Sequence, residues 1–153
     1  MSKFSKQLSQ GQKYELESLK YLDYDSFKHD TKYRKEYDLI IIKDGKEIKI
    51  EVKSDRQASR TGNLAIEYEC NRKPSGITST EADFWIYFIV HSDTDEVYKI
   101  PIDDLKDLVK DCHKVSGGDG GRSRMYLLHR TKIQQYLVEK NDNLTKDLKQ
   151  MKL

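Results

Sequence analysis

The sequence predicts an α/β domain in which a mixed β-sheet is flanked by helices. An amphipathic helical pattern opens the chain over residues 6–22. The continuous apolar run at residues 84–90 is typical of a central strand covered on both faces. Shorter runs alternate apolar and polar residues with the period of a strand. The expected order is a helix, four strands, a helical turn, two strands, a helix, a strand and a final helix.

Length and composition fit one domain with one core. The chain has 153 residues, of which 35% are charged, yet its net charge is only +2. Basic and acidic groups must therefore be segregated in space if a polyanion is to be bound. No apolar run reaches the ~18 residues of a membrane span, and the first residues contain no apolar signal segment. We expect a soluble, cytoplasmic protein without a membrane partner.

The helix at residues 6–22 carries one acid of interest, Glu15. On a helix Glu15 shares a face with Leu19, whereas Glu17 is rotated away from it. This spacing favours Glu15 over Glu17 as a site residue. An ordinary solvated charge explains Glu15 equally well.

A predicted hairpin follows a short expected strand at residues 24–29. Residues 39–42 are apolar and mostly β-branched, Asp44-Gly45 is a strong hairpin dipeptide, and residues 47–53 alternate polar with apolar. The pattern therefore predicts two antiparallel strands joined by a tight turn.

Two carboxylates and one amine meet on this hairpin. Glu51 and Lys53 share one face of the second strand, and Asp38, at the start of the first, can lie beside Glu51. Paired carboxylates hold a hard cation such as Mg²⁺, and the carbonyl of Val52 can supply a further oxygen. The cation lowers the pKa of its bound water. Lys53 can orient that water, help to deprotonate it, or offset charge on the phosphorus.

The spacing resembles the signature of the PD-(D/E)xK nucleases. Its elements are Asp38 and then Glu51-Val52-Lys53, and the proline of the first element is replaced by Tyr37, as is common in that superfamily. Gly11 to Glu15 resembles the first-helix motif of archaeal-type Holliday junction resolvases, in which a glutamate four residues after a glycine completes the metal site.

This resemblance implies a restriction-endonuclease-like fold for residues 1–138, followed by a lysine-rich helix or tail at residues 139–153. It implies a homodimer that cuts branched DNA with Mg²⁺, for which Mn²⁺ can substitute. The implied metal ligands are Asp38, Glu51, Val52 and Glu15, and the implied catalytic residues are Glu15, Asp38, Glu51 and Lys53.

Basic side chains in loops are candidates for DNA phosphate contacts. Each can equally be a surface charge that keeps the protein soluble. The candidates are Arg34, Arg56, Arg60, Arg72 and Lys73.

The rest of the chain adds little chemistry. Glu67 and Glu69 are interpreted as solvent or dimer-interface charges, because three acids already suffice for a site that keeps water and phosphate ligands. The glycine-rich loop at residues 116–121 lacks the lysine and hydroxyl residue of a phosphate-binding loop, so no nucleotide cofactor is expected. Cys70 and Cys112 have no zinc-type spacing.

The remaining expected elements are strands at 63–70, 96–100 and 125–129, a helical turn at 79–83, a helix from residue 103, a loop at 116–121 and a helix at 131–138.

The sequence therefore predicts a metal-dependent DNA endonuclease that hydrolyses phosphodiester bonds. An alternative is a non-catalytic nucleic-acid-binding or assembly protein that retains the fold. In a third interpretation the chain is a structural protein, in which Glu51 and Lys53 only take part in a cross-strand salt lattice on one face of the sheet.

Overall fold

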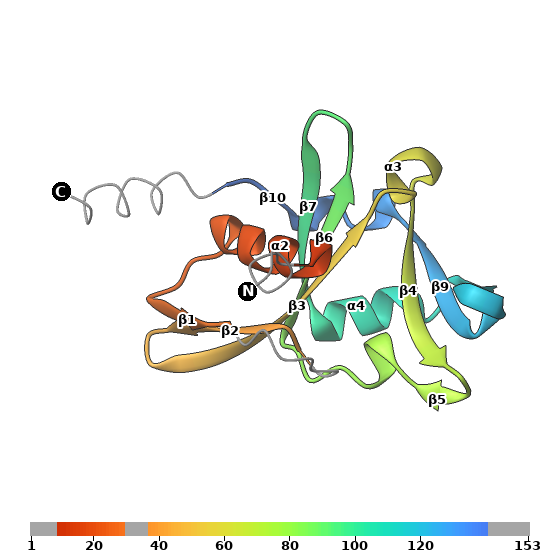
Figure 1. The fold of residues 1–153 in the computed structure, drawn as a ribbon, viewed down its shortest axis with the longest axis horizontal. Helices are drawn as coiled ribbons and strands as arrows, with labels where there is room; N and C mark the ends of the chain where they lie inside the picture. Colours follow the sequence, from red (N-terminus) through yellow and green to blue (C-terminus); the bar gives the residue numbers. More distant parts are fainter. Residues whose placement is uncertain (1–8, 30–36, 141–153) are drawn as a thin grey trace, which may run out of the picture.

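A computed structural model describes residues 9–29 and 37–140 and contains two β-sheets (Figure 1). The larger is a mixed six-stranded sheet with the order β1-β2-β3-β6-β7-β10. Its strands are β1 (Ser26–Lys28), β2 (Leu39–Lys43), β3 (Lys46–Asp55), β6 (Phe84–Val90), β7 (Asp95–Pro101) and β10 (Leu137–Val138). The predicted α/β class with a mixed sheet is thus confirmed.

A second, antiparallel sheet of four strands has the order β5-β4-β9-β8. The sequence predicted strands at two of these positions but did not separate them from the first sheet. The strands are β4 (Asn63–Cys70), β5 (Lys73–Pro74), β8 (His113–Gly117) and β9 (Ser123–His129). The α-helices are α2 (Gln10–Glu17), α3 (Ala58–Thr61) and α4 (Ile102–Val109); the 3₁₀ turns are η1 (Ser18–Tyr21), η2 (Gly76–Thr78), η3 (Asp119–Gly121), η4 (Arg130–Lys132) and η5 (Gln134–Tyr136).

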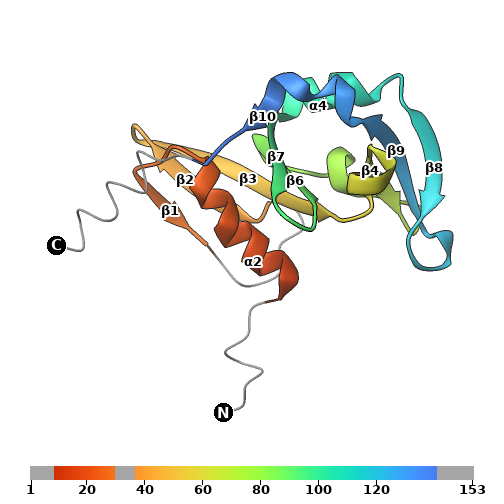
Figure 2. The ribbon, with the colours of Figure 1, turned by 90° about the horizontal axis from the view of Figure 1, so that it is seen from above.

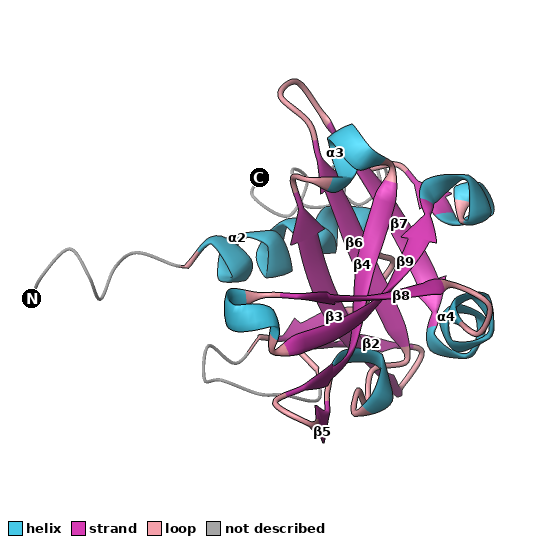
Figure 3. Ribbon diagram, turned by 90° about the vertical axis from the view of Figure 1, so that its right-hand side faces the viewer, coloured by secondary structure: helices cyan, strands magenta, loops and turns pink. Residues whose placement is uncertain are grey.

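Strand β6 lies at the centre of the molecule and is buried on both faces, as its apolar sequence predicts. Figures 2 and 3 show α2 on one side of the six-stranded sheet and the four-stranded sheet on the other. On the α2 side, Phe88 packs in a cluster that includes Leu19. On the other side, Trp85 packs in a cluster that includes Leu64 of β4 and Leu105 of α4. The larger sheet is therefore the middle layer, and each of its faces has its own core.

The hairpin β2–β3 has the register that the sequence suggests. Leu39 lies opposite Ile50, and the turn residues Asp44 and Gly45 have φ angles of 52° and 78°, as a tight primed turn requires. Ile50 is fully buried on the α2 side. Glu51 consequently points to the opposite face, toward the second sheet.

Strand β3 runs parallel to β6, and the chain between them crosses one face of the sheet. That crossover contains α3, β4, β5 and η2. It covers the face on which Glu51 lies, because β4 and η2 contribute to the core on that side. The crossover places residues 71–80 opposite the polar face of β3.

The first helix is shorter than the pattern at residues 6–22 suggests. Ser9 caps α2 reciprocally with Gln12, in bonds of 3.1 and 3.0 Å. At the other end the Ser18 hydroxyl donates a 2.6 Å bond to the carbonyl of Glu15, and the chain tightens into η1. Residues 6–8 lie outside the described part of the chain.

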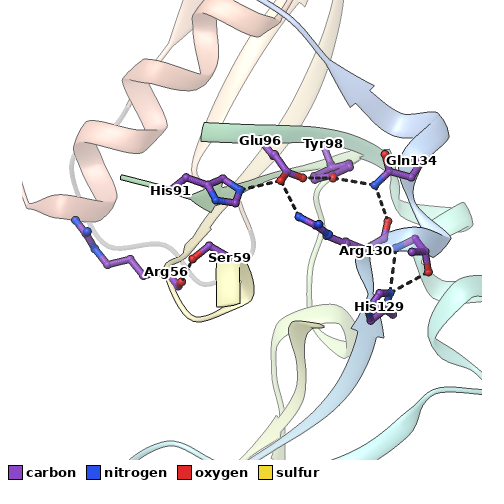
Figure 4. A network of polar contacts seen from close by, with 9 residues as sticks. Arg56, Ser59, His91, Glu96, Tyr98, His129, Arg130 and Gln134 are labelled. Atoms are coloured by element: carbon purple, nitrogen blue, oxygen red, sulfur yellow. Dashed lines mark hydrogen bonds and ion pairs between the residues drawn. The ribbon is translucent and has the colours of Figure 1, made fainter. Parts of the chain in front are cut away.

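The helix expected at residues 131–138 is wrong. The segment forms two 3₁₀ turns and then β10, whose Leu137 and Val138 pair with β7. A polar network holds the turns against β7 (Figure 4). The Glu96 carboxylate accepts hydrogen bonds from Arg130 at 2.9 Å and from Tyr98 at 2.6 Å. These tertiary contacts override a weak local helix preference.

Two further local expectations are also wrong. The helical turn expected at residues 79–83 lies earlier, at η2, because the positive φ of Gly76 (+53°) places the bend there. The loop expected at residues 116–121 begins inside β8, which pairs with β9. Within the described ranges, no helix has the length and apolar character needed to cross a membrane.

Candidate active site

A cavity of about 500 Å³ lies between the polar face of β3 and the crossover. Asp38, Glu51 and Lys53, three of the four predicted catalytic residues, line one wall. The crossover supplies the opposite wall, which comprises Glu67, Cys70, Asn71, Lys73, Pro74, Ser75, Gly76 and Ser79. The structure thus brings the two acids and the amine of the predicted signature into one concave site.

Asp38 is fixed to β3 by two hydrogen bonds. Its amide donates to the carbonyl of Ile50 at 2.9 Å, and its carboxylate Oδ2 accepts from the amide of Val52 at 2.7 Å. Continuing the β2–β3 register places Asp38 opposite Glu51. Burial raises the pKa of Asp38, and the Val52 amide and the positive charge of Lys53 partly offset that rise.

Glu51 is the most buried acid of the site, with 5% of its surface exposed. Its Oε1 accepts a 2.8 Å hydrogen bond from the Thr80 hydroxyl, and its Oε2 lies 3.1 Å from the Lys53 ammonium. Burial raises the pKa of Glu51, Lys53 and Thr80 lower it, and the negative charge of Asp38 raises it further. Because burial disfavours the charged form of Glu51, a cation beside its carboxylate is needed to favour the anion.

Lys53 lies on the more exposed side of the Asp38 and Glu51 carboxylates. Its side chain is 43% exposed, and its ammonium lies 5.5 Å from the centroid of the Trp85 ring. Trp85 is directly opposite Glu51 in the β3–β6 register and is itself buried. The ring gives the amine an apolar support on one side, while the cavity is on the other.

Glu15 does not line the cavity. Its carboxylate contacts Nε2 of His29 at 2.7 Å, and both side chains are largely buried. Burial raises the pKa of Glu15, the contact with His29 lowers it, and the negative charge of Asp38 raises it. Glu15 therefore lies within electrostatic range of Asp38, although α2 packs on the other face of the sheet.

The donor set of the cavity suits a hard divalent cation. Asp38 and Glu51 offer carboxylate oxygens. Val52, the third predicted ligand, does not line the cavity; its side chain packs on the α2 side, and its backbone amide is directed toward Asp38. In the described part of the chain, no group of three or more His, Cys, Asp or Glu side chains is placed to hold a metal ion. The two carboxylates form a smaller set, of the kind that Mg²⁺ completes with water and phosphate.

The predicted phosphate contacts divide into two regions. Lys73 lines the cavity, and Arg72 is exposed in the same turn with a φ of 65°. Arg56 and Arg60 lie in the segment after β3, outside the cavity lining, and Figure 4 shows the Arg56 carbonyl accepting a bond from Ser59. Arg34 lies outside the described residues.

Sequence reasoning missed two features of the site. Thr80 supports Glu51 and also accepts a 3.3 Å hydrogen bond from the Trp85 indole. Glu67 belongs to the cavity wall, although we expected it to be a solvent or dimer-interface charge; Glu69 instead pairs with Arg124 at 3.2 Å. The signal for Thr80 was weak, because a threonine in a loop has no spacing that identifies its partner.

Comparisons with protein-family models, with curated proteins and with solved structures each found no match.

Proposed function

We propose that the chain is a metal-dependent DNA endonuclease that hydrolyses phosphodiester bonds. The observation that carries the proposal is the convergence of Asp38, Glu51 and Lys53 on one cavity of about 500 Å³. One buried and one half-buried carboxylate with raised pKa values, beside an amine that is 43% exposed, form a pattern typical of a catalytic site rather than of a surface salt bridge.

Asp38 and Glu51 would hold Mg²⁺, for which Mn²⁺ would substitute. A bound divalent cation polarises a phosphoryl oxygen and lowers the pKa of its water. Lys53 would orient that water or offset negative charge on the phosphate, since its ammonium is 3.1 Å from Glu51 and faces the cavity. Glu15 would act from the α2 side, through the electrostatic repulsion between its carboxylate and that of Asp38.

The opposite wall would hold the DNA strand. Lys73 supplies a positive charge, and Asn71, Ser75 and Ser79 supply polar groups that suit phosphate oxygens. The Ser75 hydroxyl is buried beside this wall and has no hydrogen-bond partner among the described residues. Arg72, in the same turn, would extend the positive surface.

We further propose, from the likeness of Glu15, Asp38 and Glu51-Val52-Lys53 to the resolvase motifs, that the substrate is branched DNA and that the protein acts as a homodimer. Analytical ultracentrifugation of the free chain tests the dimer directly. A monomer that cuts linear duplex as readily as a junction would remove this finer proposal and leave the nuclease chemistry intact.

A non-catalytic nucleic-acid-binding protein is the second candidate. The 3.1 Å Lys53–Glu51 ion pair favours it, because both charges are already paired in the described structure. In that case the cavity would bind a phosphate through Lys73 and Lys53 without hydrolysis.

Cleavage assays separate the two candidates. The purified chain is incubated with a four-way junction, linear duplex and single strands, in Mg²⁺ and in EDTA, beside Lys53→Ala and Asp38→Asn. Lys46→Ala is the matched control, because Lys46 is an exposed lysine at the other end of β3. Metal-dependent cutting that only the two site variants abolish supports the nuclease. Binding without cutting in every condition supports the second candidate.

A further inference from the structure

A second hollow, of about 280 Å³, lies across η2 from the candidate active site. Ile77 and Thr78 of η2 line it, whereas their chain neighbours Gly76 and Ser79 line the first cavity. A single 3₁₀ turn therefore separates the two spaces. Helix α4 and strand β9 complete the second hollow, through Lys106, Val109 and Tyr126.

An aromatic pair supports the wall of this hollow. The Tyr126 ring packs on the ring of Tyr68, with centroids 4.6 Å apart and planes tilted by 37°. Lys114 lies opposite Tyr126 in the β8–β9 register, and its ammonium is 5.8 Å from the Tyr126 centroid and 5.7 Å from the Tyr68 centroid. Both rings are partly buried and also pack against the core.

The chemistry of the hollow combines flat apolar surface with positive charge. Ile77, Val109 and the Tyr126 ring provide the apolar surface, and Lys106 adds a second ammonium. Among the described residues that line it, none carries a carboxylate. Asp107, the neighbour of Lys106 in α4, is paired with Lys110 at 3.0 Å. Stacking surfaces beside lysines are the features with which proteins bind unpaired nucleotides.

We propose that the hollow binds an unpaired nucleotide of the same DNA strand that passes through the candidate active site. The base would lie against Tyr126, and a phosphate would contact Lys106 and Lys114. This inference rests on the proposed function for the identity of the ligand as DNA. It deepens that function, because it selects substrates in which the strand is unpaired beside the cut.

Fluorescence anisotropy with a labelled 12-nucleotide single strand and the matching duplex, both in EDTA, tests the proposal. We expect the double variant Lys106→Gln/Lys114→Gln and the single variant Tyr126→Leu each to weaken single-strand binding about tenfold or more, and Tyr126→Phe to leave it unchanged. Lys20→Gln/Lys28→Gln is the charge-matched control, on η1 and β1. The lysine variant keeps the test informative if Tyr126→Leu fails to fold.

Unchanged single-strand binding by Lys106→Gln/Lys114→Gln would overturn the inference, as would an equal loss in the control. The result is independent of cleavage, because no metal is present. Wild-type protein that cuts DNA while the lysine variant binds normally refutes the nucleotide site alone. Protein that never cuts but loses single-strand binding in the variant refutes the nuclease and keeps the nucleotide site.

Discussion

Asp38 and Val52 are joined by a 2.7 Å hydrogen bond from the amide of Val52 to the carboxylate of Asp38. Asp38 precedes the first residue of β2, so this side chain continues the β2–β3 ladder where the strand itself has not begun. The bond fixes the first acid against the strand that carries Glu51 and Lys53. It also directs one carboxylate oxygen at the backbone and leaves the other for a ligand.

Asp38→Asn should separate the charge of this group from its hydrogen bond. The amide oxygen of Asn can still accept from Val52, so we expect little change in the free energy of unfolding and complete loss of metal-dependent cleavage. Asp38→Ala removes both and should also destabilise the fold by about 1–2 kcal/mol. Urea unfolding and a junction-cleavage assay measure the two effects. Equal cleavage by wild type and Asp38→Asn would contradict a metal role for Asp38.

Thr80→Val should weaken the support of Glu51 without changing the volume that the side chain occupies, because threonine and valine have the same shape. Loss of the hydroxyl leaves Glu51 and the Trp85 indole without a common partner. We expect a destabilisation of about 1 kcal/mol and a fall in cleavage, or in Mg²⁺ affinity, of about ten- to a hundredfold.

Thr80→Ser retains the hydroxyl and should recover most of the activity. Thr131→Val, which removes a hydroxyl near His129 on η4, is the control for a general effect on stability. If Thr80→Val and Thr131→Val lower cleavage equally, the support that Thr80 gives to Glu51 is not important for the reaction.

Stability should fall as the pH rises through the titration of Asp38 and Glu51. Burial raises the pKa of Asp38 above 3.8 and that of Glu51 above 4.5, so the folded protein binds these protons more tightly than the unfolded chain does. This stabilisation is fully present below the ordinary carboxyl pKa values and is lost as the pH rises through the raised ones. Denaturant unfolding in EDTA across this range measures it.

The double variant Asp38→Asn/Glu51→Gln should flatten the dependence of the free energy of unfolding on pH in this range, because it removes both titrating groups. Mg²⁺ binding requires the two carboxylates in their charged form, so addition of Mg²⁺ near the raised pKa values should release protons from wild type and not from the double variant. Identical pH profiles for the two proteins would rule out the assignment of the titration to this pair.

Gly76→Ala should disrupt the wall of the cavity. Gly76 has a φ of +53°, and an added Cβ would overlap the carbonyl oxygen of Glu67 on β4. We expect a cost of about 1–3 kcal/mol or more, with loss of cleavage. Gly45→Ala is the matched control, since Gly45 also has a positive φ (+78°) but open space around it. The prediction is wrong if thermal melting shows the two alanine variants to be equally stable.

Local patterns predicted the parts of the structure that depend on neighbours in sequence. Asp44-Gly45 predicted the turn, period-two alternation assigned Glu51 and Ile50 to opposite faces, and the apolar run at β6 predicted burial on both sides. These features follow from steric rules that act over a few residues.

Features that depend on distant partners could not be predicted in the same way. Leu137 and Val138 form a strand because the edge of β7 is available to them, and no local pattern marks that edge. The separation of β4 and β9 into a second sheet likewise depends on long-range pairing. Thr80 reaches Glu51 only because the crossover returns over the face of β3.

The parallel pairing of β3 with β6 means that the cavity can form only after a long stretch of chain has closed on itself. The two strands are neighbours in space, yet the whole crossover separates them in sequence, so a large loop must close before either wall faces the other. The hairpin can form on its own timescale, but Glu51 meets Thr80 only after that closure. In a partly folded chain, Asp38, Glu51 and Lys53 can therefore lie together on the hairpin before the crossover forms the opposite wall of the cavity.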